Sequence, residues 1–159
     1  MNRKEAEKLI GTRVQAWTAA NGTYVGTLTG VIPAAKWRGT ILITGVLAPA
    51  HHFEYGRGIV RRGFRPGQTI EVGGVNISPS DAEGTDYLSA LTAATLRNEA
   101  LAAAAPSSSP NLAALLVLNR VNRKIMAAEK KRLETGVWEQ PCLEAAETAV
   151  CSAGHKESL

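Results

Sequence analysis

The first half of the chain alternates apolar and polar residues in short runs, a pattern typical of half-buried strands, after a short charged helix predicted at about residues 3–9. Asn21-Gly22 predicts a two-residue type I′ turn, because both of its positions must adopt positive φ. This turn sets Trp17 opposite Gly26 in the predicted hairpin. The face expected to enter the core consists of Trp17, Ala19, Tyr24, Gly26 and Leu28.

Two further segments extend this predicted sheet. Residues 38–47 are rich in β-branched side chains and predict a strand that is mostly buried on both sides. Gly73-Gly74 predicts a second tight hairpin, in which Val72 faces Val75. Short strands joined by such turns are typical of small barrels, so we expect an SH3-like antiparallel β-barrel over about residues 11–79.

Helical signals dominate the second half. Ser80 and Glu83 have the spacing of a capping box, which predicts a helix from there to about Ala104. A second long helix is expected between Pro110 and Gly136, because proline suits the first helical position and glycine suits the end.

A last short helix is predicted after Pro141. The expected fold class is therefore α+β, a small antiparallel SH3-like β-barrel followed by a helical C-terminal half. We place the barrel and its short N-terminal helix in residues 1–79. The helical region covers residues 80–159 and is expected to pack on the barrel or on a partner.

The beginning of the chain also resembles a known family. Residues 9–14 (LIGTRV) followed by residues 21–28 (NGTYVGTL) resemble the opening of Sm-like small barrels, where a short helix leads into a strand and an NG-type turn precedes a Gly-x-Leu strand. The resemblance covers roughly a fifth of the chain and implies a barrel. The family's RNA pocket has no counterpart here, because residues 31–37 (VIPAAKW) stand where its binding residues are expected.

Composition and charge narrow the function classes. The chain has 159 residues, 45% of them hydrophobic, and a net charge of +4, with ten Lys/Arg against four Asp/Glu in residues 1–79. Attraction to nucleic acid or another anionic partner is therefore expected mainly in that half. The longest purely apolar run, Leu112–Leu118, is too short to span a bilayer, so we expect no membrane association and a cytoplasmic location.

The run HHFEYGRGIVRRGFRPG, residues 51–67, is the strongest cluster of chemical groups. Its glycines and aromatics suit a loop that contacts phosphates and stacks on bases, which makes nucleic acid an alternative partner. The same charges also suit an edge strand that avoids unwanted pairing. The candidate nucleic-acid contacts are Arg57, Arg61, Arg62 and Arg65.

Nothing in the sequence identifies a metal or a cofactor. His51 and His52 are adjacent, so only one of them could join Glu54 in an extended segment, and no third ligand is evident. The chain also lacks a nucleotide-binding glycine motif or a GxSxG elbow, so an enzyme is the less favoured class. A small-molecule enzyme with a site between barrel and helices stays as an alternative, with His51 or His52 beside a carboxylate.

The leading hypothesis is a non-enzymatic interaction module, a subunit of a homo-oligomer or structural assembly. The first half of the second long helix is apolar on all sides and requires a cover, from the rest of the chain or from a partner protein. Two tryptophans near element ends are expected to be exposed contacts. The predicted interaction surface consists of Trp37, Leu112, Leu115, Leu116 and Trp138.

Overall fold

The computed structural model describes residues 1–18, 22–49, 53–54, 59–60, 63–145 and 147. The chain divides into two compact units. The first contains Met1–Ala50 and Gly63–Ala90, and the second contains His51–Arg62 and Leu91–Leu159. Within the described residues, no helix has both the length and the apolar character needed to cross a membrane.

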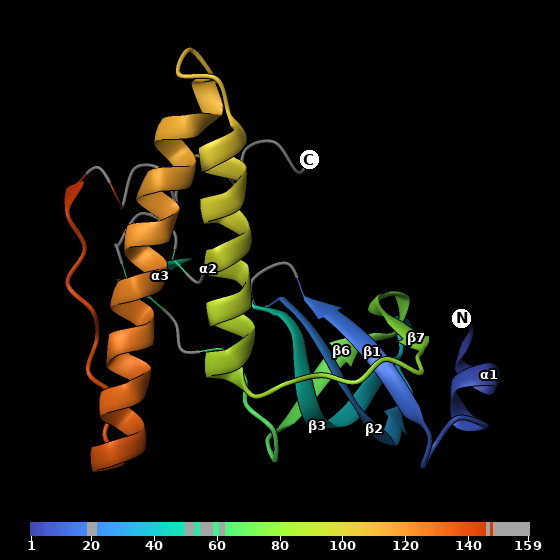
Figure 1. Cartoon of the computed structure of the whole chain (residues 1–159). Coiled ribbons are helices and arrows are strands. Elements are labelled where there is room, and N and C mark those ends of the chain that lie inside the picture. Colours follow the sequence, from blue (N-terminus) through green and yellow to red (C-terminus); the bar gives the residue numbers. More distant parts are fainter. Residues whose placement is uncertain (19–21, 50–52, 55–58, 61–62, 146, 148–159) are drawn as a thin grey trace. The chain divides into compact units, whose positions relative to one another are not determined.

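The first unit is an antiparallel sheet preceded by a short helix (Figure 1). Its strand order is β6-β3-β2-β1-β7, and the described residues show no pairing between the edge strands β6 and β7. The class α+β is thus confirmed, but the sheet is open and the predicted closed SH3-like barrel is not confirmed. The elements are α1 (Arg3–Glu7), β1 (Arg13–Thr18), β2 (Gly22–Ile32), β3 (Arg38–Pro49), β6 (Thr69–Gly73) and β7 (Ile77–Pro79).

The first hairpin has a different register from the predicted one. Thr18 pairs with Gly22 and Trp17 with Thr23, so residues 19–21 connect the strands, where the predicted turn used only Asn21-Gly22. An odd shift moves every β1 side chain to the other face of the sheet. Trp17 is consequently 49% exposed, and Val14 and Ala16 occupy the core instead. Ala19 and Asn21 lie outside the described residues.

Two other strand predictions are also wrong. In β3, Ile41 and Ile43 are buried but Leu42 between them is exposed, so the strand has one core face and not two. Gly73-Gly74 does not form a hairpin, because a 3₁₀ turn, η1 (Gly74–Asn76), carries the chain from β6 to β7 at the opposite edge of the sheet. Val72 is therefore in the core while Val75 is almost fully exposed.

A glycine pair fixes the segment that follows β7. A Cβ on Gly45 would lie 2.6 Å from Gly84, and a Cβ on Gly84 would lie 2.6 Å from Gly45, so the two backbones are in direct contact. Next to them, the Val46 N–H donates to Thr85 O at 2.8 Å and the Thr85 N–H donates to Val46 O at 3.0 Å. The absence of side chains at both glycines allows this close approach.

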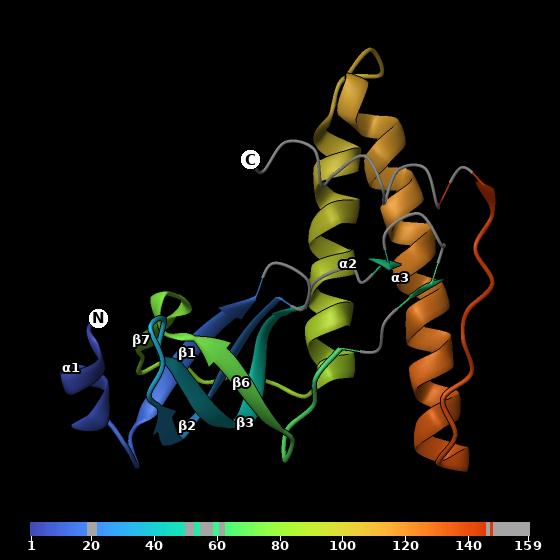
Figure 2. The ribbon, with the colours of Figure 1, turned by 180° about the vertical axis from the view of Figure 1, so that it is seen from behind.

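The second unit is built on two long helices, α2 (Tyr87–Ala104), whose first turn belongs to the first unit, and α3 (Pro110–Thr135). Figures 1 and 2 show them side by side, and Thr95 Oγ1 contacts Met126 Sδ across them at 3.8 Å. The unit also contains the short paired strands β4 (Phe53–Glu54) and β5 (Ile59–Val60). Leu91 on α2 and Val121 and Ile125 on α3 are all buried.

The helix boundaries were predicted with mixed success. Pro110 begins α3, and Gly136 ends it with φ +74° and an N–H that donates to Arg132 O at 2.7 Å, as expected. However, α2 begins at Tyr87 and not at the predicted capping box of Ser80 and Glu83.

Asp86 caps α2 instead, because its Oδ1 accepts from the Ser89 N–H at 2.9 Å and its Oδ2 accepts from the Ser89 hydroxyl at 2.5 Å. The helix predicted after Pro141 falls mainly on residues 146 and 148–159, which are not described.

Candidate functional site

Of the four arginines predicted to contact nucleic acid, the structure describes one, and that one is buried. Arg57, Arg61 and Arg62 lie outside the described residues, so their prediction stays as it was. Arg65 is only 9% exposed, with its guanidinium 5.1 Å from the centre of the Tyr87 ring and its Nη1 donating to Gly63 O at 2.9 Å. This placement corrects the expectation for Arg65, because a buried guanidinium that holds its own loop does not present itself to phosphate.

The cluster around Arg65 is the aromatic core of the first unit. The Tyr24 and Phe64 rings meet edge to face with centroids 5.5 Å apart, and the Phe64 N–H donates to the Tyr24 hydroxyl at 3.4 Å. Burial raises the pKa of Tyr24 well above its ordinary value. Within this cluster the Tyr24 hydroxyl serves as the acceptor for the Phe64 N–H.

The two tryptophans of the predicted interaction surface are both half-buried. Trp37 packs its indole against the backbone of Gly74, which leaves only part of the ring for a partner. The predicted histidines lie outside the described residues. Elsewhere in the described chain, no group of three His, Cys, Asp or Glu side chains is placed to hold a metal ion.

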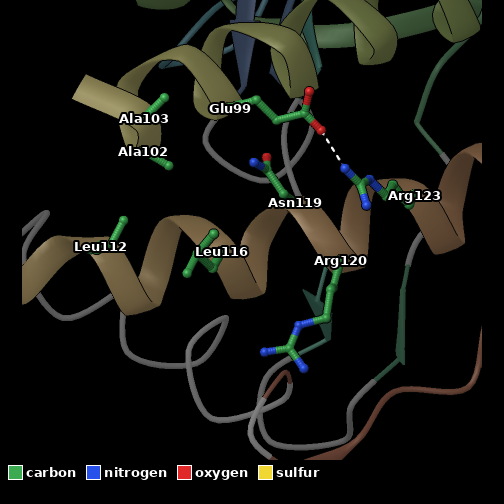
Figure 3. A pocket seen from close by; sticks show the side chains of 8 residues that line it. All are labelled: Glu99, Ala102, Ala103, Leu112, Leu116, Asn119, Arg120 and Arg123. Carbon is green, nitrogen blue, oxygen red and sulfur yellow. Dashed lines mark hydrogen bonds and ion pairs between the residues drawn. The ribbon is translucent and has the colours of Figure 1, made fainter. Parts of the chain in front are cut away.

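The leucines of the predicted surface lead to a groove between α2 and α3 in the second unit (Figure 3). Its volume is about 500 Å³. Leu112 and Leu116 line it, and Leu116 is 49% exposed, whereas Leu115 is half-buried and does not line the groove. The described lining residues are Glu99, Ala102, Ala103, Leu112, Leu116, Asn119, Arg120 and Arg123.

The apolar part of the groove follows from residue size and helical spacing. Leu112 and Leu116 are four residues apart, so their side chains lie on one side of α3, one turn above the other. Ala102 and Ala103 line the groove from α2, and their short side chains leave the space that larger residues would fill. The result is an apolar surface that stays open to solvent.

The other end of the groove is polar. Glu99 on α2 and Arg123 on α3 form an ion pair with Nη2 2.6 Å from Oε1 (Figure 3). Asn119 is only 5% exposed, yet no hydrogen-bond partner within the described chain reaches its Oδ1. Arg120 is exposed, and Figure 3 shows it pointing away from the Glu99 and Arg123 pair. In the described part of the chain, Arg120 forms no ion pair.

The sequence alone identified only the leucines of this groove. No binding role was predicted for Glu99, Asn119, Arg120 or Arg123. Asn119, Arg120 and Arg123 follow Leu116 by three, four and seven residues, a spacing that places them on one side of α3. The match with Ala102 and Ala103 depends on how α2 and α3 pack, which a single sequence does not give.

Comparisons with known proteins add little to this site. No protein-family model matches the chain, and no curated protein matches it. Among solved structures, the chain is similar to kinase-associated protein B from Bacillus cereus. The identity is 17%, the TM-score is 0.49, and the match covers 79% of this chain and 96% of that chain. A likeness of this degree carries no conclusion about the partners or activity of this chain.

Proposed function

We propose that the chain is a non-enzymatic interaction module that docks an apolar helical segment of a partner protein in the groove between α2 and α3. The observation that carries this proposal is the exposed Leu116 beside an open apolar groove of about 500 Å³. Docking of an apolar helix face into a groove is a recurrent mode of recognition. Because each fully buried leucine contributes roughly 1.5–3 kcal/mol, a few such contacts suffice for a specific interaction.

The chemistry of the lining supports binding over catalysis. The described lining residues include no serine, cysteine or histidine that could act as nucleophile or general base. The one carboxylate among them, on Glu99, is occupied by the Arg123 guanidinium. What the groove offers is apolar contact area with charged residues at its rim, the usual composition of a protein-binding surface.

A labelled peptide tests this function. The probe is a fluorescein-labelled, alanine-rich helical peptide of about 15 residues that carries two leucines one turn apart and a glutamate one turn further along. We expect saturable binding by fluorescence anisotropy, with a loss of about ten-fold or more in affinity for Leu116→Asp. Leu133→Asp is the matched control, because Leu133 is 60% exposed on the same helix and does not line the groove.

The Leu133→Asp control distinguishes binding in the groove from nonspecific binding to exposed apolar residues. Equal binding by Leu116→Asp and Leu133→Asp, or no binding by the unmodified chain, would remove the groove as a docking site. Light scattering on the same proteins identifies self-association. A dimer that Leu116→Asp converts to a monomer would make a second copy of the chain the occupant of the groove, as expected for a homo-oligomer.

A further inference from the structure

We propose, resting on the function above, that the occupant of the groove is an acidic amphipathic helix of another protein, with a carboxylate of that helix bound at Arg120. The structure supplies three reasons. They are the order of side chains along α3, the absence of an ion pair at Arg120 among the described residues, and the buried amide of Asn119.

The order of side chains along α3 sets a direction for the occupant. Leu112, Leu116 and Arg120 follow each other at four-residue intervals, so they lie along one side of the helix at about 6 Å per step. The groove therefore presents two apolar positions and then a cation. A complementary helix carries two apolar residues one turn apart and an Asp or Glu one turn beyond them.

Arg120 is the cation at the groove that is available to such a carboxylate. Its neighbours on α3 are already paired, Arg123 with Glu99 at 2.6 Å and Lys124 with Glu147 at 2.7 Å. Arg120 has neither an ion pair nor a hydrogen bond among the described residues, although its charge helps to lower the pKa of Glu147. Because a guanidinium donates two parallel hydrogen bonds to a carboxylate, it favours this partner group geometrically as well as electrostatically.

Asn119 adds a requirement for a hydrogen-bond donor. Its side chain is nearly buried next to Arg120 in the sequence, and its Oδ1 has no hydrogen-bond partner in the part of the chain that the structure describes. A buried acceptor without a donor is costly, and a hydroxyl or amide on the occupant would offset that cost. The groove thus selects a helix that combines apolar residues, a carboxylate and a neutral donor, and it disfavours a basic helix by charge repulsion.

The test compares the glutamate peptide with a twin in which lysine replaces the glutamate. We expect the unmodified chain to bind the glutamate peptide about three- to ten-fold more tightly, a preference that shrinks as salt is added. Arg120→Glu should reverse the preference toward the lysine peptide. Lys130→Glu is the matched control, since Lys130 is exposed on the same helix, does not line the groove and makes the same change in net charge.

The outcomes separate this inference from the proposed function. Equal binding of both peptides by the unmodified chain, unchanged in Arg120→Glu, would overturn the acidic helix and leave the apolar groove in place. Binding of neither peptide would remove the groove itself as a docking site. An identical effect of Lys130→Glu and Arg120→Glu would also overturn the inference, because net charge alone would then account for the preference.

Discussion

Trp37 packs its indole directly on the backbone of Gly74, and the Gly74 N–H donates to Trp37 O at 2.9 Å. A Cβ at Gly74 would overlap the indole, so the ring would have to move. We expect Gly74→Ala to lower the free energy of unfolding by about 1–3 kcal/mol, as overpacking does. Urea denaturation followed by tryptophan fluorescence measures this loss.

The residue next to it provides the control. A Cβ at Gly73 meets nothing within 4 Å, and Gly73 has φ −60°, a conformation open to any residue. Gly73→Ala should therefore change the free energy of unfolding by no more than about 0.5–1 kcal/mol. Equal losses for the two variants would show that the contact with Trp37 is not what excludes a side chain.

A second prediction concerns the Asp86 cap of α2. The Ser89 hydroxyl and then the Ser89 N–H hold the pKa of Asp86 below its usual range. The charged carboxylate thus stabilises the folded chain above the unfolded pKa of about 3.9, and this contribution is lost as pH falls through the lower folded pKa. We expect Asp86→Ala to cost about 1 kcal/mol at neutral pH.

Asp86→Asn separates the cap from the charge. Asparagine caps helices about as well as aspartate, so this variant should keep most of the stability at neutral pH but lose the part that depends on pH in the acid range. Thermal unfolding followed by circular dichroism across the acid range reads both effects. A cap role for Asp86 is refuted if Asp86→Ala unfolds like the unmodified chain at every pH.

The ion pair between Lys124 and Glu147 ties the segment after α3 to that helix. Lys124 Nζ donates to Glu147 Oε2 at 2.7 Å and to Cys142 O at 3.1 Å, and the Glu144 N–H also donates to Glu147 Oε2. Burial raises the pKa of Glu147, but these hydrogen bonds and the charges of Lys124 and Arg120 outweigh it and hold the pKa below its usual range.

We expect Lys124→Met to raise the pKa of Glu147, measured by NMR titration of its carboxyl carbon. The contribution of this pair to stability is present above the unfolded pKa of Glu147 and fades as pH falls through the lower folded pKa. Lys131→Met is the matched control, because Lys131 forms the same kind of pair with Glu139 at 2.6 Å where both side chains are exposed. A carboxyl titration that stays the same in Lys124→Met would contradict the assignment.

Replacing the buried polar residue Asn122 with an apolar residue is expected to stabilise the fold. It is fully buried on α3, and neither Oδ1 nor Nδ2 finds a hydrogen-bond partner among the described residues. Since an unsatisfied buried amide costs about 1–3 kcal/mol, Asn122→Leu should raise the free energy of unfolding by about 1 kcal/mol. Chemical denaturation measures the change, and a clear loss of stability would mean that the amide is needed where it lies.

The element types were largely predictable, but pairings were not. Pro110 and Gly136 set the bounds of α3 through backbone conformations that few residues replace, so local sequence was sufficient. The register of β1 and β2 depended on whether two or three residues join them, and one residue decides whether Trp17 or Ala16 enters the core. After β6 the chain passes to β7, which pairs with β1 at the opposite edge of the sheet. The local sequence Gly73-Gly74 does not indicate which strand β7 pairs with.

In the candidate groove, too, some residues were predictable from local sequence and others depend on how the helices pack. Leu112 and Leu116 were recognisable because an apolar run on all sides of a helix requires a cover. Arg65 was misread because a run of arginines looks alike in sequence whether a guanidinium reaches solvent or packs on Tyr87. Glu99 and Arg123 are 24 residues apart, and only the packing of α2 on α3 brings their charges together.

Next to the contact between Gly45 and Gly84 lie two amides whose hydrogen exchange reports how often this part of the first unit opens. The amide hydrogens of Val46 and Thr85 are held by one isolated pair of bonds, outside the ladders of the sheet. The rate at which they exchange with deuterated water therefore reports local opening of the segment that leads into α2. The exchange rates of the β2 amides report opening of the sheet itself. Hydrogen-exchange rates of these two sets of amides therefore measure separately the opening of the segment before α2 and the opening of the sheet.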